Sequence, residues 1–280
     1  MKKTLLLAVI LILCGCQSIE PSVVTPSASH TVPPTATVTS TASQTPIPTA
    51  TKTANIPTET PIPFEVCCPL EEETIQSLQR IIVNPLVIPP IGKDDGHHGV
   101  DFAYYRRGDR DSIQGIEVYA VLPGTTVLTL EDEIPYGYAI LIETPLSYLP
   151  QTTQENILAT YLPIPDEVVY QGECPAFTAP TPTGEMSVYH LYAHFEERPD
   201  YLPGDPIQCG TFLGTVGNSG YSSNPHLHLE TRLGPSGVDF STMAFYKASY
   251  TEQQRANYCL WRMSGYYQLF DPFLILSTAE

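Results

Sequence analysis

Six of the seven histidines lie in close pairs along the chain, and imidazole side chains can both bind metal ions and carry protons. The pairs are His97 with His98, His190 with His194, and His226 with His228, while His30 stands apart near the N-terminus. One pair of histidines is more often structural than functional. The residues around each pair therefore decide which chemistry the sequence can support.

The first pair opens a motif that ends in a carboxylate, Asp101. In extended backbone the side chains alternate between two faces, so His97 and Asp101 point the same way. Gly99 lies between them on that face and leaves it open. An imidazole and a carboxylate are thereby presented together.

The third pair follows the same alternation, so His226 and His228 share one face while Leu227 and Leu229 pack behind them. Two imidazoles and one carboxylate form a donor set that suits zinc. A fourth position left to water is the pattern of catalytic zinc sites. The first and third pairs together therefore indicate a candidate zinc site.

The motifs follow one another in a specific order. They are HxGxD at 97–101, Tyr-Ala-His at 192–194, glycine-rich segments at 204–210 and 213–220, and Pro-His-Leu-His-Leu-Glu at 225–230. This order resembles that of the lysostaphin/LytM-type zinc metallopeptidases, which cut peptide cross-links of peptidoglycan. The resemblance covers residues 95–144, 187–233 and the Phe-Asp-Pro end at 270–272.

The resemblance implies a role for each of five residues. His97, Asp101 and His228 correspond to the metal ligands, and His194 and His226 correspond to catalytic histidines that do not bind the metal. The implied cofactor is Zn²⁺, and the implied activity is that of a zinc-dependent endopeptidase. Its substrate would be a peptide cross-link or stem peptide of peptidoglycan.

Three further residues lie in or near these motifs but are not among the five that the resemblance assigns. His98 occupies a variable position, and we expect it to line the groove. His190 is expected to pack or to support the site from behind, with substrate contact as an alternative. Glu230 has the same parity as His228, so it either orients that ligand or is a plain solvated carboxylate.

Charge excludes one class of partner. The chain carries 13 lysines and arginines against 30 aspartates and glutamates, which gives a net charge of −17. Nucleic-acid binding depends on clustered positive charge, so nucleic acid is not expected as a partner. The same charge gives no long-range attraction to anionic wall polymers, so binding to them requires a shaped groove.

The N-terminal segment resembles an export signal. An apolar run at 5–13 follows two lysines and is shorter than the about 20 residues that span a bilayer. Leu13, Gly15 and Cys16 resemble a bacterial lipobox, although Cys14 replaces the usual small residue. We therefore expect lipidation of Cys16 and a membrane anchor, with an ordinary signal peptide as the alternative.

Composition divides the chain into three parts. Residues 21–63 are rich in Pro, Ser and Thr, and no Phe, Trp or Tyr occurs before Phe64. Such a segment has too little apolar area to offset the entropy cost of folding, so it is expected to be a disordered tether. The predicted parts are a signal peptide at 1–15, a lipidated tether at 16–63 and a peptidase domain at 64–280.

The fold class predicted for the third part is mainly β, an antiparallel sheet of LytM type with a few peripheral helices. Strands are expected at 116–121, 126–130, 138–143, 187–194, 211–216 and 226–231. Helices are expected at 71–82, 154–162 and 252–263, the last with a capping box formed by Thr251 and Gln254.

Three segments are longer than the resemblance would give, at 102–114, 145–186 and 235–269. Loops tolerate insertion and often set specificity, so 145–186 and 235–269 are expected to border the groove. Five cysteines follow Cys16, and outside the cytoplasm disulfides are expected. Two bridges and one free thiol are predicted among Cys67, Cys68, Cys174, Cys209 and Cys259, in a pairing that the sequence does not fix.

Three functions compete at this point. The first is an active endopeptidase on peptidoglycan, held outside the cytoplasm at the cell envelope. The second is a non-enzymatic relative that binds wall or activates an amidase; such relatives usually lack a metal residue, and none is missing here. The third is a zinc peptidase that acts on secreted proteins, which the sequence separates poorly from the first.

Overall fold

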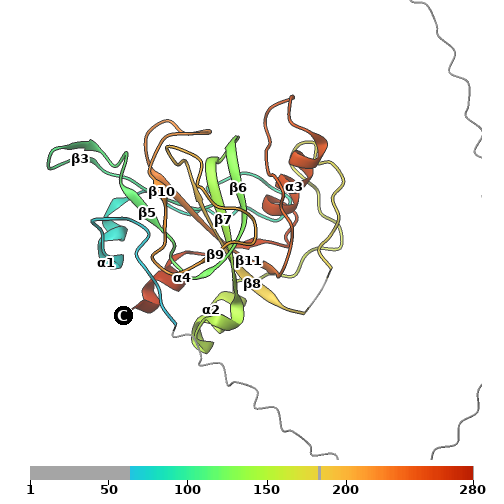
Figure 1. Cartoon of the computed structure of the whole chain (residues 1–280). Helices are drawn as coiled ribbons and strands as arrows, with labels where there is room; N and C mark the ends of the chain where they lie inside the picture. Colours follow the sequence, from blue (N-terminus) through green and yellow to red (C-terminus); the bar gives the residue numbers. More distant parts are fainter. Residues whose placement is uncertain (1–63, 182–183, 280) are drawn as a thin grey trace, which may run out of the picture. The chain divides into compact units, whose positions relative to one another are not determined.

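A computed structural model describes residues 64–181 and 184–279 of the chain (Figure 1). The predicted signal peptide, the lipidation of Cys16 and the tether fall on residues 1–63 and lie outside the described residues. Within the described residues, no helix combines the length and the apolar character needed to cross a membrane.

A single large antiparallel sheet organises the described residues. Its strands run in the order β1-β2-β11-β8-β7-β6-β9, with β12 paired to β11. They are β1 Ile82–Asn84, β2 Val100–Phe102, β6 Gly124–Glu133, β7 Gly137–Pro145, β8 Met186–Ala193, β9 Pro206–Ile207, β11 Leu227–Pro235 and β12 Gln268–Leu269. Two small sheets pair β5 (Glu117–Tyr119) with β10 (Phe212–Thr215) and β3 (Tyr105–Arg107) with β4 (Arg110–Ser112). The prediction of a mainly antiparallel β fold is confirmed.

All six predicted strands are present, as β5, β6, β7, β8, β10 and β11. The strands that were not predicted are two or three residues long, which is too short to show an alternating pattern. Two of them, β3 and β4, form an exposed hairpin inside the long connection at 102–114.

The helix predicted at 252–263 is confirmed as α3 (Glu252–Arg262). The helix predicted at 154–162 is present as α2, but it begins and ends earlier, at Gln151–Leu158. Thr251 begins α3 as predicted, because its side chain accepts from the Gln254 amide while the Gln254 side chain accepts from the Thr251 amide. The helix predicted at 71–82 is wrong in extent. Glu72 has a φ of 64°, outside helical backbone, so α1 spans only Ile75–Leu78. The remaining helical segments are α4 (Phe273–Leu276) and the short 3₁₀ turns Gln79–Ile81, Leu146–Tyr148 and Ser277–Ala279.

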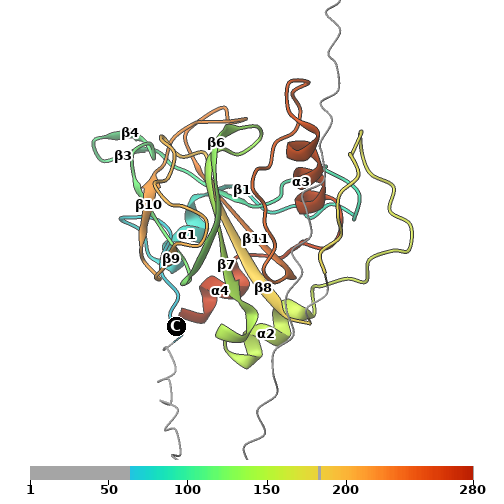
Figure 2. The same cartoon turned by 45° about the vertical axis from the view of Figure 1, so that its right-hand side comes forward.

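Apolar side chains cover both faces of the sheet. On β11, Leu227, Leu229 and Leu233 join a core that includes Phe102 and Ile142 on one face. The other face packs under α3, where Trp261 contacts Tyr189. Figures 1 and 2 show α3 on one flank of the sheet, with α2 and α4 near the end of its strands. Both faces of the central strands are therefore buried, and the alternate residues of β11 that face α3 are polar.

The cysteines pair as Cys67–Cys209 and Cys174–Cys259, and Cys68 is the free thiol among the described residues. The prediction of two bridges and one free cysteine is thus confirmed. The second bridge spans 85 residues and joins the insertion at 145–186 to α3 in the insertion at 235–269. The two insertions are therefore covalently linked.

Candidate metal centre

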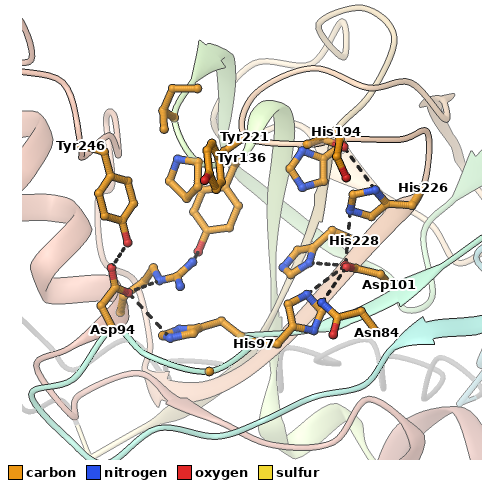
Figure 3. Close-up of a pocket in the computed structure, with 17 residues that line it drawn as sticks. Asn84, Asp94, His97, Asp101, Tyr136, His194, Tyr221, His226, His228 and Tyr246 are labelled. Carbon is orange, nitrogen blue, oxygen red and sulfur yellow. Dashed lines mark hydrogen bonds and ion pairs between the residues drawn. The ribbon is translucent and has the colours of Figure 1, made fainter.

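The pairing of β2 with β11 places Asp101 directly opposite His228. On the other side of β11, β8 sets Ala193 opposite His228, so His194 follows at the edge of the same site. His97, Asp101 and His228 each offer a ligand atom, and these atoms all lie within 4.8 Å of one another. Segments more than one hundred residues apart in sequence thereby meet at one point of the sheet (Figure 3).

Asp101 lies at the centre of this group. Its Oδ1 is 2.8 Å from Nδ1 of His228, 3.0 Å from Nε2 of His97 and 3.5 Å from Nε2 of His226. Its Oδ2 accepts from the Asn84 side chain at 3.2 Å, which orients the carboxylate. The ring of His194 lies with its centroid 4.6 Å from that of His226, so all five residues of the predicted site are brought together.

Three of the rings are held by main-chain oxygens. Nδ1 of His97, His194 and His226 lies 3.0, 2.8 and 2.8 Å from the carbonyl oxygens of Pro85, Ser219 and Asn224 respectively. A carbonyl oxygen can only accept, so the proton of each neutral ring sits on Nδ1. The Nε2 lone pair of each ring is thereby left for a metal ion or a proton.

Glu230 supports His228 from behind. Its Oε2 lies 3.5 Å from Nε2 of His228 and accepts from the Tyr136 hydroxyl at 2.8 Å, while its Oε1 accepts from Nε of Arg232. The Glu230 side chain is 0% exposed, so the alternative of a plain solvated carboxylate is wrong. The contact agrees with a carboxylate that orients the His228 ring.

The segment between His97 and Asp101 lies closely against His228. A Cβ placed on Gly99 would come within 2.7 Å of Cε1 of His228 and 2.6 Å of the Leu229 carbonyl oxygen. Only a glycine allows this approach. With the segment in place, two imidazole nitrogens and one carboxylate oxygen converge, which is a donor set that fits zinc.

Burial and hydrogen bonding fix the charges of the metal-free site. Burial lowers the pKa of His194 to about 3 and also lowers the pKa of His226, so both rings are neutral at pH 7. Burial also opposes charge on His228, but its hydrogen bonds to Asp101 and Glu230 outweigh it and raise its pKa to about 9. The hydrogen bond from His228 holds the pKa of Asp101 well below its usual value despite burial.

His194 reaches the site through an unusual backbone conformation. It follows the last residue of β8 and has a φ of 66°, a left-handed value that is uncommon outside glycine. Simple alternation would have placed its ring on the same face as His190. His190 instead lies in the core, fully buried against Thr144 and Tyr192, as the packing interpretation predicted. It does not line the cavity described next, so it does not serve as a substrate contact there.

The site opens into a cavity of about 650 Å³, within the range of ligand pockets. His98 lines it as predicted, although its ring is almost fully buried and its Nδ1 accepts from Arg232 at 2.7 Å. Across the cavity from His194 and His226 lie Asp94 and Tyr246 (Figure 3). Tyr136 and Arg262 also line the cavity, and Arg262 donates to Asp94. None of these four residues belongs to a motif, so no sequence pattern singles them out.

One of the two large insertions lines the cavity, and the described residues of the other do not. The insertion at 235–269 supplies Tyr246 and Arg262, so its predicted position is confirmed. The insertion at 145–186 supplies no lining residue among the described residues, and the prediction that it borders the groove is wrong. It lies one layer behind, where the Gln171 side chain accepts from the Asp94 amide and donates to Asp95.

No family model matches the chain, and no curated protein matches it. Among solved structures it is similar to the catalytic domain of the antimicrobial peptidase lysostaphin from Staphylococcus simulans, at 18% identity over 74% of this chain and 99% of that one, with a TM-score of 0.35. A peptidase M23 from Pseudomonas aeruginosa matches at 16% identity over 76% of this chain, with a TM-score of 0.32. A zinc-containing peptidase from Vibrio cholerae matches at 16% identity over 60% of this chain, with a TM-score of 0.28. The alignments span 54% of the Pseudomonas chain and 33% of the Vibrio chain.

Proposed function

We propose that this protein is a zinc-dependent endopeptidase that hydrolyses peptide cross-links or stem peptides of peptidoglycan. The observation that carries the proposal is the convergence of His97, Asp101 and His228, with His194 and His226 facing the same point. None of the five residues is displaced from the site. This completeness speaks against the alternative of a non-enzymatic wall-binding or amidase-activating protein.

The five residues have two kinds of role in the proposed hydrolysis, metal binding and proton transfer. His97, Asp101 and His228 would hold the zinc ion, which supplies a Lewis acid and lowers the pKa of a bound water from 15.7 to about 7. Nε2 of His194 or His226 is free to accept a proton from the attacking water. Once protonated, the same atom can donate to the oxyanion or return the proton to the leaving amine.

The metal requirement gives the direct test of this function. Purified protein incubated with wall material is expected to release peptides that mass spectrometry identifies. A chelator should abolish the release, and about one equivalent of zinc per chain should restore it. Activity that survives complete removal of metal would contradict the proposal, and cleavage of secreted proteins without release from wall would favour the third function instead.

We further propose that the protein works outside the cytoplasm, anchored by lipid on Cys16. Two disulfides among the described residues support an oxidising location. Cys16→Ser should move the protein from the membrane fraction to the soluble fraction, whereas the neighbouring control Cys14→Ser should leave it in the membrane fraction. Unchanged fractionation of Cys16→Ser would contradict the lipid anchor.

A further inference from the structure

The wall of the cavity contains a charged group that the proposed hydrolysis does not use. Arg262, at the end of α3, lines the same cavity as the metal centre, with its side chain 10% exposed. Its Nε donates to Oδ1 of Asp94 at 2.8 Å, and its Nη1 donates to the Tyr136 hydroxyl at 3.4 Å. Among the described residues that line the cavity, Arg262 is the one lysine or arginine.

Asp94 and Arg262 differ in how many of their hydrogen-bonding groups already have partners. The Asp94 carboxylate accepts from Arg262 and from the hydroxyls of Tyr258 and Tyr246, so both its oxygens are engaged. The Arg262 guanidinium has five N–H groups, and its bonds within the described residues use Nε and Nη1. Nη2 makes no hydrogen bond to the described residues. The guanidinium therefore keeps an unbonded Nη2, whereas each Asp94 oxygen already accepts at least one hydrogen bond. A spare donor favours an anion over a cation as ligand.

The guanidinium is held firmly in this position. It lies over the rings of Tyr258 and Tyr136, 5.3 and 5.7 Å from their centroids. Phe245 stacks on Tyr258 at 4.9 Å, and the next residue, Tyr246, has a left-handed φ of 70°. Left-handed backbone in a residue of this size is strained and persists only where the surrounding structure holds it. Tyr246 thereby places its hydroxyl on Asp94 at the edge of the cavity (Figure 3).

We propose that Arg262 binds a carboxylate of the substrate, so that the protein selects peptides carrying a free carboxylate on the Tyr246 side of the scissile bond. This inference rests on the proposed function, because it assigns the ligand of the same cavity. The net charge of −17 disfavours anionic peptides at long range, so a cation in the cavity would favour their binding locally. A planar guanidinium matches a carboxylate with two parallel hydrogen bonds. The carboxylate is either the C-terminus of the peptide or an acidic side chain.

The test compares four acetylated pentapeptides of one alanine- and glycine-based sequence. They are a neutral glutamine peptide with an amidated C-terminus, the same peptide with a free C-terminus, its glutamate counterpart with an amidated C-terminus, and the peptide with both acids. Binding is measured by calorimetry on the zinc-loaded full chain carrying His226→Ala to suppress hydrolysis. At least one single acid should bind about 10- to 100-fold more tightly than the neutral peptide, the usual size for a charge-assisted pair. Which acid does so identifies the source of the carboxylate.

In the same background, Arg262→Gln should reduce the ratio of acidic-peptide affinity to neutral-peptide affinity to about one. Arg262→Lys should leave an intermediate ratio, because lysine keeps the positive charge but cannot form two parallel hydrogen bonds with a carboxylate. Arg255→Gln, on the same helix but outside the lining, is the matched control and should keep the full ratio. Thermal unfolding checks that each variant is folded. Equal binding of acids and neutral peptide, or an acid preference that survives Arg262→Gln, overturns the inference. Failure of the proposed function would appear separately, as no cleavage of wall or peptide by the unmodified protein.

Discussion

Replacement of His228 by alanine is expected to remove zinc and peptidase activity together, whereas His226→Ala should keep about one zinc ion per chain. The reason is that the resemblance assigns His228 as a metal ligand and His226 as a catalytic histidine. In agreement with this assignment, His228 belongs to the group of three ligand atoms within 4.8 Å of one another. The rate of His226→Ala should fall by about 10²- to 10⁴-fold, the usual contribution of a general acid or base. His194→Ala should behave like His226→Ala. Elemental analysis beside the cleavage rate on purified wall measures both effects.

His190→Ala is the matched control for these variants, because His190 is buried near the site but does not line the cavity. It should change stability without changing zinc content or the rate per folded molecule. If His226→Ala is purified without zinc and His228→Ala retains it, the two assignments are reversed. If all three site variants keep normal activity, the domain is better described as a binding module.

Glu230→Ala is expected to lower the free energy of unfolding by about 3–5 kcal/mol, measured by denaturant titration of the metal-free protein. The substitution removes a carboxylate that is 0% exposed and leaves Arg232, 2% exposed, without its ionic partner. The Tyr136 hydroxyl also loses its acceptor. Two neutral acceptors of Arg232, the Tyr267 carbonyl and His98, remain but carry no compensating charge.

The control for this variant is Glu197→Ala, because Glu197 is an exposed carboxylate on the same domain. Its effect should stay within about 0.5 kcal/mol, as is usual for surface positions. A loss below about 1 kcal/mol for Glu230→Ala would show that the neutral partners suffice for Arg232. The role of Glu230 in orienting the His228 ring would then have to be tested by measuring zinc affinity.

The sequence predicted the candidate site well because two of its parts are local patterns. His226 and His228 fall at the start of a long strand, and the alternation of β11 sends Leu227 and Leu229 to the core as expected. Long strands such as β6, β7 and β8 were also predictable, since each is long enough to show an apolar strand pattern over several residues. The grouping of Asp101 with His228 came from the order of motifs, and its physical cause is the pairing of β2 with β11.

What the sequence could not predict depends on contacts between distant residues. The left-handed turn at His194 overrides the alternation that strand patterns assume. The bond between Arg262 and Asp94 spans 168 residues, and neither residue has a neighbouring motif that would connect them. The same limit applies to the disulfide Cys174–Cys259, which joins the insertion at 145–186 to α3.

Each of the three proposed ligands is held by a partner before any ion arrives: His97 by the Pro85 carbonyl, Asp101 by the Asn84 side chain and His228 by Glu230. The rotational entropy of those side chains is therefore lost when the chain folds, and little further ordering accompanies coordination. The spacing between the donor atoms is then set by the folded protein rather than by the ion. A cage of this kind discriminates among metals by radius and preferred geometry, because its ligands cannot relax toward a poorly fitting ion.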